Sequence, residues 1–74
     1  MNNELAPHQQ RVIVEKEELD DKIKKLLAFT KGEIYRQLPA DERDRLRRQF
    51  NLMDEYSKVL GERIDAFKQQ VEAP

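Results

Sequence analysis

The sequence predicts an all-α protein: a helical hairpin of a medium and a long helix with a short connecting helix, assembled as a homo-oligomer. Hydrophobic residues make up 38% of the 74 positions and charged residues 39%, a balance typical of amphipathic helices. Two long stretches carry apolar residues at alternating steps of three and four, the heptad period of packed helices. Gly32 and Pro39, which favour turns, lie between these stretches. We therefore expect a single helical domain over residues 1–74.

The first predicted helix covers residues 7–29 and follows a flexible N-terminus at residues 1–6. Pro7 suits the first turn of a helix, where its missing N–H costs nothing. The apolar seam of this helix consists of Val12, Leu19, Ile23 and Leu26. Lys16 occupies one of the core positions of that seam. Three acidic residues precede a lysine by four positions, which predicts the ion pairs Glu18–Lys22, Asp20–Lys24 and Asp21–Lys25.

Gly and Pro residues predict the boundaries of the connection and of the last helix. Gly32 is expected to end the first helix in a left-handed conformation, and residues 33–38 to form a short helix. Pro39 pushes Leu38 out of the helical region and opens a long helix over residues 40–71. Its seam consists of Leu46, Phe50, Met53, Leu60, Ile64, Phe67 and Val71, with Ser57 as the polar interruption. Gly61 inside this helix indicates either the close approach of a neighbouring backbone or a bend.

The apolar surface predicts association. The first helix is shorter than the last, so part of the long seam stays uncovered in one chain. Leu52 and Tyr56 form a second apolar row beside that seam. A domain of 74 residues is also close to the size at which one core barely offsets chain entropy. We therefore expect an even-numbered homo-oligomer built from symmetric dimers.

Composition argues against several classes of function. The formal charge is −1, from 14 basic and 15 acidic residues, whereas a general nucleic-acid binder is normally basic. There is no Cys and one histidine, His8, so neither a metal site nor a cofactor is expected. Thr30 and Ser57 lie far from His8 in sequence, which makes an enzyme the least expected class. No stretch is apolar enough for a membrane span, and a cytoplasmic protein is expected.

Anion capture is the chemistry that the remaining residues favour. Lys or Arg can hold the phosphates of a compound bound between protomers, while a planar side chain stacks on a base. The candidate ligand-binding residues are cationic or planar side chains of the first helix and one arginine of the last: His8, Arg11, Lys22, Lys24, Lys25 and Arg63.

A family resemblance gives these candidates a more specific meaning. The residues that carry it are the run from Pro7 to Val12, then Glu15, Leu19, Lys22, Leu26 and Phe29, and later Leu38, Glu42, Leu46, Gln49, Met53, Tyr56, Leu60, Arg63 and Ile64. From about residue 7 to 67 the chain resembles a family of small helical phage proteins, found in crAss-like and tailed phages. Members include the anti-CBASS sponges, which sequester cyclic dinucleotides and cyclic trinucleotides made by bacterial immune enzymes.

The resemblance implies a homohexamer in the bacterial cytoplasm that holds these signals between protomers without cleaving them. It implies that an aromatic residue near the start of the first helix stacks on bases, and that position falls on His8. The family has a tyrosine there, so the imidazole of His8 is a departure. A lysine later in the helix, Lys22 or Lys24, would meet phosphates, and Arg63 would serve the trinucleotide site.

Two other hypotheses stay open. A helical interaction protein would bind a host or phage protein through the row of Leu52 and Tyr56 or through an arginine cluster. A weak nucleic-acid binder would use the same cluster, and its affinity would fall steeply with salt. The cluster consists of Arg43, Arg45, Arg47 and Arg48.

Overall fold

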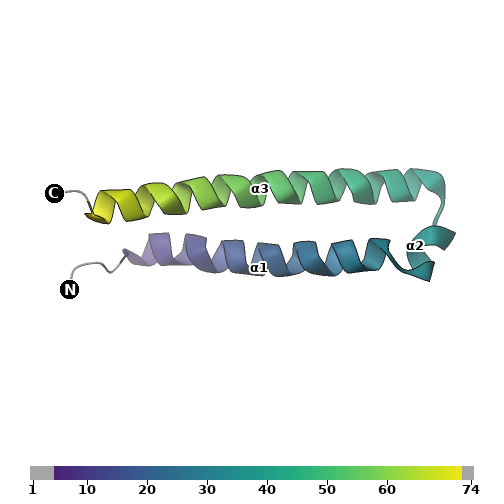
Figure 1. The fold of residues 1–74 in the computed structure, drawn as a ribbon, viewed down its shortest axis with the longest axis horizontal. Coiled ribbons are helices and arrows are strands. Elements are labelled where there is room, and N and C mark those ends of the chain that lie inside the picture. Colours follow the sequence, from purple (N-terminus) through teal and green to yellow (C-terminus); the bar gives the residue numbers. More distant parts are fainter. Residues whose placement is uncertain (1–4, 73–74) are drawn as a thin grey trace.

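The protein folds as a long helical hairpin. The computed structural model describes the backbone of residues 5–72 and the side chains of residues 5–69. It contains α1 (Pro7–Thr30), α2 (Glu33–Gln37) and α3 (Ala40–Glu72). α1 and α3 lie side by side in opposite directions, and α2 turns the corner between them (Figure 1). The predicted all-helical class is confirmed for the described residues, and the homo-oligomer stays a prediction.

The hairpin is a rod that measures 55 × 16 × 16 Å. The start of α1 and the end of α3 lie at one end, which we call the open end; α2 lies at the other, the closed end (Figure 1). No helix in the described range 5–72 combines the length and the apolar character needed to cross a bilayer.

The start of α1 is fixed by side chains of its own first turn. The backbone N–H of Ala6 donates to Oε1 of Gln9 at 2.9 Å. Nε2 of Gln10 donates to the carbonyl of Leu5 at 2.8 Å. These bonds tie Leu5 and Ala6 to the helix, although both belong to the segment predicted to be flexible. The rest of that segment, residues 1–4, lies outside the described residues.

The prediction that Gly32 adopts a left-handed conformation is wrong. Gly32 has φ −94° and ψ 176°, and it forms the extended N-cap of α2. The N–H groups of Lys31 and Gly32 donate to the carbonyls of Ala28 and Phe29, both at 3.1 Å. These turn bonds close the last turn of α1, so the chain reverses without a positive φ. Leu38 is extended, with φ −71° and ψ 151°, which confirms the effect expected from Pro39.

The core lies where the two predicted seams face each other. Val12, Leu19 and Leu60 are the buried apolar residues of the described chain, and Leu60 is fully buried. Ile23, Met53, Ile64 and Phe67 are partly buried and pack against them. The side chain of Val71, the last residue of the predicted seam, lies outside the described residues. One chain therefore encloses only a thin line of apolar side chains.

Candidate functional site

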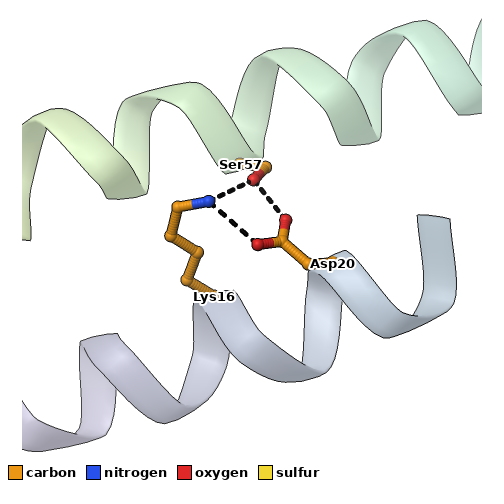
Figure 2. A network of polar contacts seen from close by, with 3 residues as sticks. All are labelled: Lys16, Asp20 and Ser57. Atoms are coloured by element: carbon orange, nitrogen blue, oxygen red, sulfur yellow. Dashed lines mark hydrogen bonds and ion pairs between the residues drawn. The ribbon is translucent and has the colours of Figure 1, made fainter. Parts of the chain in front are cut away.

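The two polar residues that interrupt the apolar seams meet in the middle of the hairpin. Nζ of Lys16 donates to Oγ of Ser57 and to Oδ2 of Asp20, each at 2.9 Å. Oγ of Ser57 in turn donates to Oδ1 of Asp20, so the three side chains close a ring of hydrogen bonds between α1 and α3 (Figure 2). A polar group that is removed from water is stabilised only when it is paired in this way. The network therefore allows Lys16 and Ser57 to occupy core positions.

The absence of a side chain at Gly61 leaves room for the side chain of Lys16. A Cβ atom built at Gly61 would lie 3.3 Å from Cε of Lys16, which is a tight contact. The sequence left open a neighbouring backbone or a bend at Gly61, and the structure instead places a side chain there. Gly61 thus lets Lys16 reach across to Ser57.

This network predicts a specific pH dependence. The hydrogen bond from Ser57, and then the one from Lys16, hold the pKa of Asp20 below its ordinary value. A carboxyl group whose pKa is lower in the folded chain stabilises the fold fully above its unfolded pKa, about 3.9, and loses this effect as pH falls through the lower folded pKa. Asp20→Asn should therefore lower the melting temperature by a constant amount at pH 5–7 and by less below about pH 4.

Thermal unfolding followed by circular dichroism between pH 7 and pH 2 measures this difference. The comparison with the unchanged protein removes the contribution of the other carboxylates. Asp21→Asn is the matched control, because Asp21 forms an exposed ion pair with Lys25 at 3.1 Å and no bond to α3. A difference in melting temperature between Asp20→Asn and the unchanged protein that does not vary with pH would contradict the lowered pKa of Asp20.

The structure places four of the six candidate ligand residues on one exposed stripe of α1. His8, Arg11, Lys22 and Lys25 lie on it, and all four are exposed. Together with Glu15 and Glu18 they follow one another at steps of three and four, which keeps them on one face of the helix. The hydroxyl of Tyr56 donates to Oε2 of Glu15, so this stripe borders the face of α3 that carries Tyr56. We call it the cationic stripe.

The other two candidates lie on different surfaces. Arg63 is seven residues after Tyr56 and shares its face of α3, with its guanidinium 5.9 Å from the centre of the Phe67 ring. Lys24 lies on the other side of α1, beside Asp20, where its charge helps to lower the pKa of Asp20. Lys22 and Lys24, which the sequence left as equivalent choices, are thus separated by the structure.

One chain does not bring the candidates into a single pocket. Arg11 and Lys22 are eleven residues apart on a helix that rises about 1.5 Å per residue, so about 16 Å separates them. Lys25 is already paired with Asp21. The predicted pair Glu18–Lys22 is not formed, and Asp20 binds Lys16 instead of Lys24. Lys22 consequently forms no ion pair with any described residue.

Internal ion pairs involve two of the four arginines in the cluster at the start of α3. Arg45 lies 2.9 Å from Glu42 and 3.8 Å from Asp41, and Arg47 lies 2.8 Å from Asp44. Arg48 forms no ion pair among the described residues and lines an open groove of about 610 Å³. The other residues of this groove are Arg45, Gln49, Leu52, Met53 and Tyr56.

Within the described residues, no three His, Cys, Asp or Glu side chains are placed to hold a metal ion. A helical hairpin with a cationic stripe and a thin core has the form of a small binding protein. Its sequence matches the Sequestin family over residues 6–66, and the chain belongs to that family. This span contains all six candidate residues and confirms the resemblance seen in the sequence. Searches of curated proteins and of solved structures return no match.

Proposed function

We propose that this protein is a phage-encoded sponge that sequesters cyclic dinucleotide and cyclic trinucleotide signals of bacterial CBASS immunity without cleaving them. The observation that carries the proposal is the cationic stripe, which presents Arg11 and Lys22 to solvent on the same face as His8. Membership of the Sequestin family supports it, because the family name indicates sequestration of a signalling molecule.

The chemistry of the stripe suits a phosphodiester ligand that also carries bases. Lys and Arg donate charge-assisted hydrogen bonds to phosphate oxygens, about twice as strong as neutral ones. The imidazole of His8 offers a flat surface on which a base can stack. The hydroxyls of Ser57 and Thr30 are engaged in bonds to Asp20 and to the carbonyl of Leu27. These bonds support the proposed binding without cleavage.

An exposed stripe on a single rod cannot surround a ligand, so the proposal includes association. In a homo-oligomer, for which the resemblance implies a hexamer, a neighbouring copy would cover the stripe and complete the pocket. Excluding water in this way strengthens each contact between a cation and a phosphate.

Isothermal titration of the purified protein against a panel of cyclic dinucleotides and trinucleotides tests the proposal. We expect binding with a dissociation constant below about 1 μM, which corresponds to about 8 kcal/mol of binding free energy. Light scattering should give the mass of an oligomer, and chromatography of the denatured complex should return the nucleotide intact. The absence of binding across the whole panel, or recovery of a linear product, would contradict the proposal.

A second candidate function rests on the groove at Leu52 and Tyr56. Leu52 is 67% exposed and Tyr56 is 46% exposed, and as neighbours on one face of α3 they form an apolar patch, a feature that can mark a protein-binding surface. A protein partner could occupy this surface, as the alternative reading of the sequence proposes. Titration of the nucleotide panel separates the two functions, because only the first requires a small ligand.

A further inference from the structure

The closed end carries a groove of about 410 Å³ that all three helices line. Its lining residues are Leu27 and Thr30 of α1, Tyr35 of α2, and Arg47, Phe50 and Asn51 of α3. Half of these side chains are apolar or aromatic. The ring of Phe29 packs edge-on against that of Tyr35, with the ring centres 6.3 Å apart, which helps to hold Tyr35 in position. We call this feature the closed-end groove.

Two lysines flank Leu27 on α1, beside the closed-end groove. Lys24 lies three residues before Leu27 and Lys31 lies four residues after it, so the three side chains share one face of the helix. Lys31 is the C-cap of α1 and keeps a right-handed helical conformation, so the helical spacing extends to it. Leu27 is 42% exposed, and both lysines are exposed without an ion pair to any described residue. The row therefore presents an apolar side chain between two exposed cations.

The charge around the groove favours a negatively charged partner. Residues 22–51 contain nine basic and four acidic residues, which gives a net charge of +5. The remaining described residues, 5–21 and 52–69, contain five basic and nine acidic residues, which gives −4. Arg47 adds a cation from α3; it pairs with Asp44 at 2.8 Å, and a guanidinium has five donors, so donors remain for a second acceptor. An anionic partner is thus attracted to the closed end rather than to the open end.

The residues outside the described backbone lie too far from the groove to fill it. Residues 1–4 and 73–74 attach at the open end (Figure 1). Twenty residues separate Pro7 from Leu27, which corresponds to about 30 Å along α1. Four residues span at most about 14 Å even when fully extended. An occupant of the groove must therefore come from another molecule.

We propose that the closed-end groove binds an acidic amphipathic helix of another protein, with an apolar side chain of that helix on Leu27 and carboxylates against Lys24 and Lys31. The two lysines are seven residues apart, about 10 Å along α1, so one small anion cannot bridge them. A helix repeats its face every seven residues, so two carboxylates at that spacing meet both lysines. An apolar residue between the carboxylates then lies on Leu27.

A partner helix in this position packs against α1 and α3 at once. It covers Leu27 of α1 and Phe50 of α3, which both line the groove. Apolar contacts in a groove, with ion pairs along its edges, are a recurrent way for a helix to recognise other helices. Five residues separate Lys22 from Leu27, which turns them about 140° apart around α1. The inference therefore concerns a different face from the cationic stripe and does not rest on the proposed function.

A labelled synthetic peptide tests the proposal in solution. The probe is an alanine-rich helix of about 20 residues, long enough to be helical in water, with a leucine four residues after one glutamate and three residues before another. A second probe has lysine in place of each glutamate. Fluorescence anisotropy should show that the unchanged protein binds the glutamate peptide at least about tenfold more tightly than the lysine peptide. Equal affinity for the two peptides, or no binding of either, would overturn the proposal.

Charge reversal at Lys31 tests the position of the site. Lys31→Glu should weaken binding of the glutamate peptide by about tenfold or more and should strengthen binding of the lysine peptide, which an unfolded variant could not do. Leu27→Ser should also weaken binding of the glutamate peptide, because it removes the apolar contact. Lys68→Glu is the control, since it makes the same charge change at an exposed residue of the open half and should alter the affinity by less than about twofold. Equal weakening in Lys31→Glu and Lys68→Glu would indicate attraction by net charge and would overturn the site.

Two further measurements test other occupants of the groove. Light scattering should give the same mass for Lys31→Glu and for the unchanged protein, whereas dissociation of the variant would make the groove an interface between copies. Vesicles of anionic phospholipid should not sediment the protein, whereas sedimentation that Lys31→Glu abolishes would identify a lipid surface as the occupant. Either of these contrary results would overturn the proposal. The peptide and the nucleotide panel are titrated separately, so this proposal and the proposed function can fail independently.

Discussion

Leu60→Ala is expected to lower the free energy of unfolding by about 2–5 kcal/mol. Leu60 is the one fully buried side chain of the described core, and it packs with Val12 and Leu19 of α1. A cavity at this point removes contacts from both helices, and the rod offers few other apolar contacts to compensate. Native proteins have only about 5–15 kcal/mol of stability in total, so the loss should also lower the melting temperature by about 10 °C or more.

Urea denaturation followed by circular dichroism measures the loss, at one fixed protein concentration because association contributes to stability. Ile34→Ala is the matched control: Ile34 is 64% exposed on α2, and its change should stay within about 0.5 kcal/mol. Equal losses in the two variants would show that the core is not centred on Leu60. A charge at the same position, as in Leu60→Glu, should unfold the chain altogether.

The spacing of apolar residues was sufficient to predict which faces of the helices form the core. Steps of three and four fix the inward face of a helix, since side chains at these spacings lie above one another. The same reasoning identified Lys16 and Ser57 as interruptions of two different seams. It could not show that they meet, because spacing within a helix contains no information on the register between helices. Asp20, which completes the network, was predicted to pair with Lys24, and nothing in the sequence indicated its bond to Ser57.

The turn and the ion pairs show the same limit. Gly32 was expected to adopt a left-handed conformation because glycine is the commonest residue that does so, but hydrogen bonds at the end of α1 made this unnecessary. Asp20 has lysines both four residues before and four residues after it, and the sequence favoured Lys24. Asp20 pairs with Lys16 because both side chains also form hydrogen bonds with Ser57 of α3. Local rules are thus overridden where a second helix adds a partner.

The sequence predicted the candidate residues, but it could not show on which face of the hairpin each of them lies. All six were chosen for charge or planarity, and periodicity groups four of them on one stripe of α1. The bond between Tyr56 and Glu15 then shows which face of α3 lies beside that stripe. Lys22 and Lys24 are only two residues apart, which turns them about 200° away from each other around the helix. The two lysines therefore provide a direct test of the site.

Lys22→Ala is expected to weaken binding of cyclic dinucleotides by about tenfold or more, because it removes a charge-assisted bond to phosphate. Lys24→Ala should change the affinity by less than about twofold, since a single exposed charge on the other side of α1 acts only through screened, long-range attraction. Both lysines are exposed, and neither forms an ion pair with a described residue, so neither change should disturb the fold. The two variants have the same charge and differ only in the side of the helix that they alter.

Isothermal titration at two salt concentrations separates a local contact from a general loss of positive charge. If Lys22 binds phosphate directly, the gap between the variants persists at both concentrations, because a contact excluded from solvent is screened little. Equal weakening in both variants that disappears at high salt would instead indicate attraction by net charge. A loss confined to Lys24→Ala would place the ligand on the side of Asp20 and would move the site from the cationic stripe to the opposite face of α1.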